Sequence, residues 1–339
     1  MDDPLRELAN RERLAFVGVA KNCGKTTTLN GLLRRRESAP PALLSLGIDG
    51  EEEDVLLGTT KPPILVQPGQ WIVTARRYVE DATARLSIVA SLGLETPLGE
   101  VYLCQVRTAG ALVLAGLRQR QEVLRALDLL RAHQVSSSWL DGAYGRISGA
   151  HPDLQNAVVL STGAIAGPGL EATLAATTHL LDRLTTPGTT GATEVELICA
   201  AIKENRVLYK TASPDHQSLR RRSALLGLKE LHHPDSPALT ALAIPGLISD
   251  RVAEELLAIT VPENCPLLIP DGTVLHLSPR HLRRLRERFT LQALHPIEVA
   301  AISYNPTILG TPALAPQALK EALCDVAPPG CYVFDPLKS

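Results

Sequence analysis

Short apolar runs alternate with amphipathic stretches through the first half of the chain. Such runs predict buried strands; they lie at residues 14–19, 42–48, 100–106, 111–114, 136–140 and 157–161. Residues 63–75 predict a further β-rich excursion with a turn at Pro68-Gly69. Apolar residues at helical spacing predict helices, which lie at 26–36, 118–133 and 169–184. Because strands and helices alternate, we expect an α/β fold with a mostly parallel sheet covered on both faces.

One segment with the composition of a linker divides the chain. Residues 185–193 read TTPGTTGAT, which is small, polar and interrupted by Pro and Gly. After it, the pattern predicts strands at 195–202, 267–269, 299–303 and 332–334. It predicts helices at 252–259, 281–288 and 317–323. We therefore expect two domains, residues 1–186 and a second, smaller α/β domain of residues 194–339.

The composition is that of an ordinary globular protein, and it excludes several classes of function. The 339 residues carry a net charge of −2, which argues against binding nucleic acid by bulk phosphate neutralisation. Aromatic residues make up 3% of the chain, too few for a base-stacking surface. No apolar run approaches the roughly 18 residues of a membrane span, so we expect no membrane partner.

The start of the chain and its cysteines favour the cytoplasm. The first residues, MDDP, are acidic, which predicts no secretory signal. The six cysteines form no C-x-x-C pair, and their spacing fits neither a zinc site nor a small disulfide framework. Several of them, such as Cys104 and Cys199, fall in apolar strand-like runs. We therefore expect buried, reduced thiols in a cytoplasmic protein.

The sharpest chemical signal follows the first predicted strand. The chain reads GVAKNCGKTT from Gly18 to Thr27, and a helix is predicted to begin within this segment. A glycine-bearing loop between a buried strand and a helix is the setting of a phosphate-binding P-loop. The backbone N–H groups of such a loop and the helix dipole favour anions. The candidate nucleotide-binding residues are Lys21, Asn22, Cys23, Gly24, Lys25, Thr26 and Thr27.

Two side chains of this loop have roles that follow from their chemistry. Lys25 is expected to reach the β- and γ-phosphates of a nucleotide, and the Thr26 hydroxyl is expected to bind Mg²⁺. The loop departs from the usual pattern, because five residues separate Gly18 from Gly24. As a result, Val19 takes the position of the usual first glycine.

Other residues complete the expected site. Lys21 adds a second positive charge to the loop. The alternatives for its ammonium group are contact with the nucleotide of the same chain, contact with the nucleotide of the other chain in a homodimer, and solvation. Cys23 is expected to be a small filler in the loop. Asp49 and Asp141 each end a predicted strand, and we expect them to bind Mg²⁺ together with Thr26, with capping of a turn as the alternative. Lys25, Asp49 and Glu51 are the catalytic candidates. Glu51 begins an acidic run that could orient the attacking water, and the alternative for this run is a solvated loop.

Further segments accompany the loop in a fixed order. They are 18–30 (GVAKNCGKTTTLN), 45–51 (SLGIDGE), 106–110 (VRTAG) with 114–116 (LAG), 141–143 (DGA), 160–164 (LSTGA), and 303–306 (SYNP) with Gly310. In this order they resemble the P-loop subunit of the reactivase that accompanies lysine 5,6-aminomutase. The chain departs from that family at residues 144–146, where an Asp-Arg pair is expected, and at 116–118, where Gly-Pro-Ser is expected.

The resemblance implies a P-loop NTPase, a hydrolase that binds ATP, or GTP, together with Mg²⁺. It implies that hydrolysis drives the chaperone-like reactivation of an adenosylcobalamin-dependent aminomutase, by release of damaged cofactor with a partner reactivase subunit. The chain contains no Asp-x-His-x-x-Gly pattern, which a cobalamin-binding mutase would carry. This difference suits a reactivase.

Two other functions stay open at the level of the sequence. A P-loop kinase or ligase would act on a small anionic substrate held by the second domain. Arg220–Arg222 or the basic helix 280–288 could bind that substrate, although a solvated basic face is the alternative for both. A nucleotide-sensing adaptor would bind nucleotide without turnover, which the valine at position 19 would fit.

Overall fold

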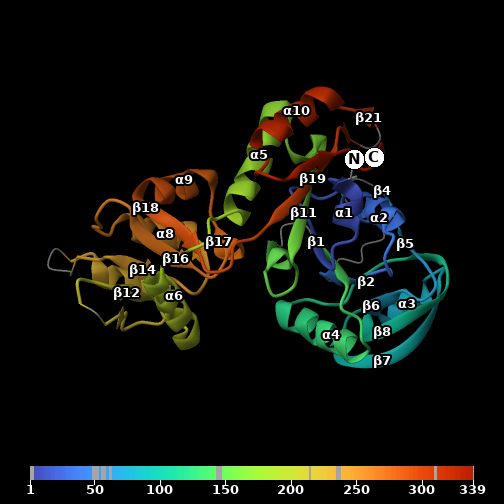
Figure 1. The fold of residues 1–339 in the computed structure, drawn as a ribbon, viewed down its shortest axis with the longest axis horizontal. Helices are drawn as coiled ribbons and strands as arrows, with labels where there is room; N and C mark the ends of the chain where they lie inside the picture. Colours follow the sequence, from blue (N-terminus) through green and yellow to red (C-terminus); the bar gives the residue numbers. More distant parts are fainter. Residues whose placement is uncertain are drawn as a thin grey trace. The chain divides into compact units, whose positions relative to one another are not determined.

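The chain forms two compact units, one of which interrupts the other (Figure 1). The computed structural model describes residues 4–47, 53–54, 59–60, 63–142, 147–213, 215–233, 238–308 and 311–338. Unit 1 comprises Met1–Leu181 and Glu298–Ser339, and unit 2 comprises Asp182–Ile297. This division differs from the expected ranges 1–186 and 194–339. The first boundary lies close to the predicted linker, but the residues after 297 return to unit 1.

Unit 1 is built on a nine-stranded, mostly parallel sheet. In order across the sheet, its strands are β22 (Tyr332–Phe334), β19 (Val299–Asn305), β11 (Ala157–Gly163), β1 (Arg13–Gly18), β10 (Ser138–Gly142), β2 (Ala42–Leu46), β6 (Trp71–Ala75), β8 (Gly99–Thr108) and β7 (Arg85–Thr96). The strands from β22 to β6 are parallel, and β8 and then β7 pair antiparallel at one edge. Because β19 and β22 extend this sheet, the last part of the chain belongs to unit 1.

Helices cover both faces of this sheet (Figure 1). Those of unit 1 are α1 (Pro4–Ala9), α2 (Lys25–Arg35), α3 (Arg76–Glu80), α4 (Arg120–Ala132), α5 (Gly169–Leu184) and α10 (Pro316–Val326), except that the last three residues of α5, from Asp182, fall in unit 2. Alternate residues of a strand point to opposite faces. Phe16 shares a core with Leu29 of α2, whereas its neighbour Ala15 shares a core with Leu127 of α4. The predicted α/β architecture with a covered, mostly parallel sheet is therefore confirmed.

Short elements complete unit 1. The 3₁₀ turns are η1 (Ile147–Ala150) and η2 (Ala164–Ala166). Two-stranded ribbons pair β3 (Glu53–Asp54) with β4 (Thr59–Thr60), β5 (Ile64–Val66) with β9 (Gly110–Leu112), and β20 (Thr307–Ile308) with β21 (Thr311–Pro312). The predicted excursion at 63–75 is thus confirmed as β5, a turn at Pro68-Gly69, and β6.

Unit 2 has a smaller sheet with its own core. The strands, in order, are β13 (Gln217–Ser218), β12 (Leu208–Lys210), β14 (Ala241–Ala243), β16 (Cys265–Ile269) and β18 (Phe289–Ala293). Of these, β14, β16 and β18 are parallel. The other elements are α6 (Ala192–Glu204), α7 (Ala224–Gly227), η3 (Leu228–Leu231), β15 (Ile248–Ser249), α8 (Asp250–Leu257), η4 (Gly272–Val274), β17 (Leu275–His276) and α9 (Pro279–Arg288). Unit 2 is therefore a second, smaller α/β body, as expected.

One predicted strand is a helix. Residues 195–202 form an apolar run, but they lie within α6. Leu197, Ile198 and Ala201 are the buried residues, and this spacing places them on one face of a helix. The polar residues on either side of the run complete an amphipathic helix, which a search for an uninterrupted apolar run does not recognise.

The same error affects one cysteine. Cys199 lies on the outer side of α6 and is exposed, so the prediction that it is buried is wrong. Cys23, Cys104 and Cys265 are buried as predicted, but Cys324 is also exposed and Cys331 is half-buried, so the prediction holds for three of the six thiols. Burial raises the pKa of Cys104 to about 12 and that of Cys265 to about 11. Both thiols therefore stay protonated at neutral pH.

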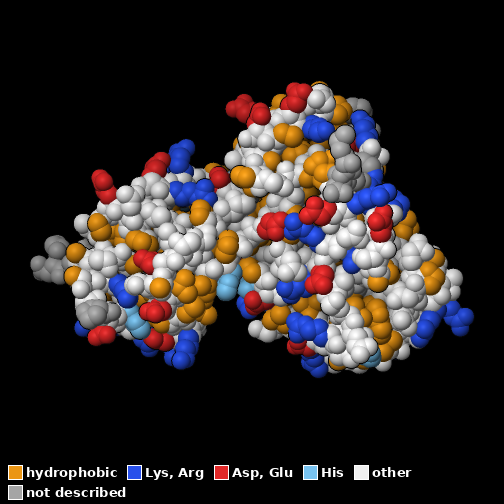
Figure 2. Space-filling view, in the orientation of Figure 1, with side chains coloured by type: hydrophobic (Ala, Val, Ile, Leu, Met, Phe, Trp, Pro, Cys, Tyr) orange, Lys and Arg blue, Asp and Glu red, His pale blue; other side chains and the backbone are white. Residues whose placement is uncertain are grey.

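The surface of each unit mixes charges of both signs. On the face shown in Figure 2, Lys and Arg alternate with Asp and Glu over both units, in keeping with the net charge of −2. Among the helices of the described ranges, none combines the length and the apolar character needed to cross a membrane.

Candidate functional site

A loop joins β1 to α2 at the carboxyl end of the parallel strands. β1 is buried and lies between β10 and β11, in the middle of the large sheet. The N–H of Val19 donates to the Ser161 carbonyl of β11 at 2.9 Å, which attaches the start of the loop to the neighbouring strand. The carboxyl ends of parallel strands are the places where open α/β sheets bind ligands. The predicted P-loop segment therefore lies where such a site is expected.

Two left-handed residues turn the loop into the helix. Asn22 has a φ of 60° and Gly24 has a φ of 101°. Glycine adopts this conformation without a steric cost, and asparagine tolerates it better than most residues. Gly24 is the N-cap of α2, and no side chain of the described structure caps this helix end. The first turn of α2 thus presents backbone donors and the positive end of the helix dipole at the loop.

Gly18 allows two side chains to fold back across the end of β1. A Cβ at Gly18 would lie 2.7 Å from Cys23 Sγ and 2.9 Å from Lys25 Nζ, so a larger residue does not fit. Cys23 is 1% exposed, in agreement with its predicted role as a filler. The Lys25 ammonium is therefore held over the loop, where it adds its charge to the helix dipole.

The remaining predicted site residues are placed unequally. Thr26 is 6% exposed in the first turn of α2, and Thr27 is half-buried beside it. Asp141 is 2% exposed on β10 and pairs in register with Phe16 of β1, so the structure brings it to the strand next to the loop. Asp49 and Glu51 lie outside the described residues. Lys21 is half-buried in the turn of the loop.

Three buried hydroxyl groups form a hydrogen-bonded chain between the start of α2 and the sheet. Ser161 of β11 and Ser303 of β19 are register partners, and their Oγ atoms lie 2.8 Å apart. The Thr28 hydroxyl of α2 donates to Ser303 Oγ at 2.7 Å, and it also lies 3.0 Å from the Gly24 carbonyl. Thr28 and Ser161 are each 0% exposed and Ser303 is 1% exposed. These contacts link the start of α2 to two neighbouring strands.

Asn305 ends β19 beside the same loop. Its Cβ lies 3.9 Å from the position that a Cβ on Gly24 would take. On the other side, a Cβ on Gly163 would lie 2.1 Å from the Asn305 carbonyl oxygen, so the ends of β11 and β19 are in close contact. Sequence reasoning noted this segment only as part of a resemblance. Each of two predicted strands contains a serine, Ser161 or Ser303, and Ser303 is followed by Tyr-Asn-Pro. This pattern is the signal that could have indicated Asn305 as a site residue.

The basic residues considered for an anionic substrate are mostly solvated or paired. Arg220–Arg222 are exposed, and the backbone N–H groups of Arg220 and Arg221 donate to the Glu230 carboxylate at 3.1 and 3.3 Å. On α9, Arg286 pairs with Asp182 at 3.1 Å. Both groups are therefore better described as exposed or paired basic faces.

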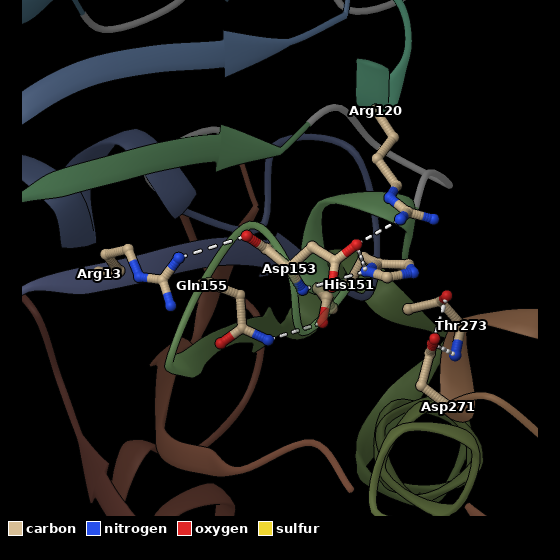
Figure 3. Close-up of polar contacts among 8 residues, drawn as sticks. Arg13, Arg120, His151, Asp153, Gln155, Asp271 and Thr273 are labelled. Atoms are coloured by element: carbon tan, nitrogen blue, oxygen red, sulfur yellow. Dashed lines mark hydrogen bonds and ion pairs between the residues drawn. The ribbon is translucent and has the colours of Figure 1, made fainter. Parts of the chain in front are cut away.

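A second polar cluster lies at the opposite end of β1 (Figure 3). The Asp153 carboxylate pairs with Arg120 and lies 3.8 Å from His151 Nδ1, and the Asp153 carbonyl accepts from Arg13 at 3.3 Å. These contacts hold the turn before β11 against the start of β1. The side chains of this cluster include no Ser, Thr, Cys or Lys, and across the described ranges no group of three or more His, Cys, Asp or Glu side chains is arranged to hold a metal ion. We therefore assign it a structural role.

Comparison with known proteins leaves the assignment to the residues themselves. No protein-family model matches the chain. A search of curated proteins found no significant match.

Proposed function

We propose that the chain is a Mg²⁺-dependent P-loop NTPase that couples the binding and hydrolysis of ATP, or of GTP, to the reactivation of an adenosylcobalamin-dependent aminomutase. One observation carries the NTPase assignment, namely the open start of α2 with Lys25 folded over Gly18. A phosphate placed there would meet backbone N–H groups, the positive end of the helix dipole and an ammonium group together. This combination is the physical basis of phosphate binding in P-loops.

The oxygen donors near the loop fit Mg²⁺. This hard cation prefers carboxylate, hydroxyl, phosphate and water oxygens. Thr26 in the first turn of α2 and Asp141 on the strand adjacent to β1 supply a hydroxyl and a carboxylate. In this proposal they hold Mg²⁺ and Lys25 binds the β- and γ-phosphates, while Asp49 and Glu51 stay candidates for the metal and for the attacking water. When bound, Mg²⁺ neutralises charge on the phosphates.

The client enzyme is proposed from the resemblance to the reactivase family. Three of the segments that carry the resemblance end at the same edge of the sheet, where β10, β11 and β19 finish. These three segments therefore lie near the loop, whereas residues 106–110 lie at the end of β8, which runs antiparallel to β6 and finishes at the other end of the strands. A partner reactivase subunit and the aminomutase are the proposed partners. A homodimer, in which Lys21 would contact the nucleotide of the other chain, is a further proposal.

Phosphate release tests the proposal directly. We expect wild type to release phosphate from Mg-ATP or Mg-GTP, alone or on addition of an aminomutase with damaged adenosylcobalamin. Lys25→Ala and Asp141→Asn should each lose this activity, whereas Lys229→Ala, which alters an exposed lysine of unit 2, should keep it.

The possible outcomes separate the proposed function from its alternatives. Release of damaged cofactor only in the presence of hydrolysable nucleotide would support the reactivase. Tight nucleotide binding without phosphate release in any mixture would instead indicate an adaptor. Transfer of phosphate to a small acceptor would indicate a kinase.

A further inference from the structure

Asn305 reaches the loop from a distant part of the chain. β19 enters the sheet only after unit 2, yet its last residue lies against Gly24, the N-cap of α2. Ser303, two residues earlier, joins the hydroxyl chain to Thr28 and Ser161. The end of β19 is therefore held near the first turn of α2 by the hydrogen bond between Ser303 and Thr28.

The side-chain amide of Asn305 has a defined orientation. Its Oδ1 accepts from the Thr307 N–H at 3.0 Å and from the Thr307 hydroxyl at 2.9 Å. A backbone N–H can only donate, so the oxygen must face Thr307 and Nδ2 must face away from it. Nδ2 makes no hydrogen bond with any part of the chain that the structure describes. The loop thus has a neighbouring donor that the fold itself does not use.

The order of the strands indicates which part of a nucleotide this donor would meet. Asp141 lies on β10, on one side of β1, whereas Asn305 lies on the other side, beyond β11. If Thr26 and Asp141 held Mg²⁺, the phosphates that it neutralises would lie toward β10. The nucleoside would then extend to the other side of β1, toward β11 and β19.

We propose that Asn305 is a specificity-determining residue of this site and that its Nδ2 donates a hydrogen bond to the nucleoside of the bound nucleotide. Ser303 acts as a positioning residue, which holds the end of β19 through Thr28. This inference rests on the proposed function, because it assumes a nucleotide at the loop. It adds a contribution from the segment that follows unit 2.

Binding of Mg-ATP and of Mg-tripolyphosphate, which lacks the nucleoside, tests the assignment by calorimetry. Asn305→Ser keeps an oxygen that can accept from the Thr307 N–H but deletes Nδ2. We expect the Kd for Mg-ATP to rise about three- to tenfold, as for loss of one hydrogen bond, and the Kd for Mg-tripolyphosphate to stay unchanged. Asn305→Asp keeps Oδ1 and should weaken Mg-ATP binding at least as much.

Two controls make the result specific. Thr307→Val removes the hydroxyl that contacts Oδ1 but keeps Nδ2, so its affinity for Mg-ATP should equal that of wild type. Lys25→Ala should weaken both ligands, because it removes a phosphate contact. Wild-type affinity for Mg-ATP in Asn305→Ser would overturn the assignment, and so would an equal loss for Mg-tripolyphosphate. If wild type binds neither ligand, the proposed function fails and the assignment fails with it.

Discussion

Two strand-to-helix junctions in this molecule differ in how the helix begins. In unit 1, β1 leads through Gly24 into α2, and no side chain among the described residues caps the first turn. In unit 2, β16 leads into η4, where the Asp271 carboxylate accepts from the Thr273 N–H at 2.8 Å and from its hydroxyl at 2.5 Å (Figure 3). The first junction therefore has no side-chain acceptor from its N-cap residue, whereas the second is closed by the chain's own carboxylate.

The comparison shows that a single residue can decide the chemistry of a helix start. Asp271 is 0% exposed, and its negative charge disfavours any anion at that junction. The start of α8, which follows β15 in unit 2, also carries an acid, Asp250, in its first turn. Gly24 places no charge at α2, and Lys25 adds a positive one. Of these three junctions, only that at β1 suits a phosphate.

Removal of the positive charge from the open junction should have the largest effect. We expect Lys25→Ala to raise the Kd for Mg-ATP about ten- to a hundredfold, because a hydrogen bond to a charged group contributes about 1.5–3 kcal/mol. Calorimetry measures the change, with Lys229→Ala as the control. Equal affinity of Lys25→Ala and wild type would show that the open junction is not the nucleotide site.

A methyl group at the closed junction should destabilise unit 2. A Cβ on Gly272 would lie 2.2 Å from the Arg183 carbonyl oxygen, so Gly272→Ala should lower the free energy of unfolding by about 1–3 kcal/mol. Both tryptophans, Trp71 and Trp139, lie in unit 1, so their fluorescence reports on unit 1, whereas circular dichroism reports on both units. The shift should therefore appear in circular dichroism.

The matched control for this prediction is Gly246→Ala. A Cβ at Gly246 meets no atom within 4 Å, so this variant should unfold like wild type. Equal stability of Gly272→Ala and Gly246→Ala would contradict the close contact between η4 and the end of α5.

Opening the closed junction should have a smaller effect. Asp271→Ala removes the acceptor for the Thr273 N–H, and loss of such a cap costs about 1 kcal/mol. Asp271→Asn keeps an acceptor and should recover most of this stability. Denaturant unfolding followed by circular dichroism compares the two variants. If Asp271→Asn is no more stable than Asp271→Ala, the hydrogen bond between the Asp271 side chain and the Thr273 N–H does not contribute to the stability of unit 2.

The smallest effect concerns pH. Partial burial opposes ionisation of Asp250, but hydrogen bonds from Ser278 and the nearby His281 outweigh it and lower the pKa of Asp250. A lowered pKa stabilises the fold above the unfolded value of about 3.9, and this stability is lost as the pH falls through the folded value.

Asp250→Asn tests this linkage. Its unfolding free energy should depend less on pH below about 4 than that of wild type. The side chain is 43% exposed, so the difference should stay below about 1 kcal/mol. Identical pH profiles for the two proteins would show that the contacts of Asp250 are not maintained in solution.

The parts of the fold that the sequence predicts are local. A buried strand, a glycine-bearing turn and a helix follow one another directly at β1 and α2, so their pattern indicates both the elements and the loop. The helix at 195–202 is not recognised because one apolar face and its neighbouring alanines resemble a strand over a short window. A short apolar run occurs in both strands and helices, so the local pattern alone does not distinguish them.

The non-local parts could not be read from the sequence. Pairing of β19 with β11 joins residues that lie on either side of unit 2, and no feature of the linker indicates that the chain returns. The position of Asn305 beside Gly24 depends on the same pairing. Lys25 and Thr26 could be predicted as site residues from one segment, whereas Ser303 required the sheet order.

The insertion of unit 2 into the sequence of unit 1 also affects the order in which the large sheet forms during synthesis. Ribosomes add about 5–20 residues per second, so β11 is complete many seconds before β19 emerges. During that interval the outer edge of β11 has no partner strand, and such an edge is a template for incorrect pairing. Gly24 also lacks its neighbour until Asn305 has been synthesised. A nascent chain of this protein therefore acquires a complete loop environment only after unit 2 has been synthesised.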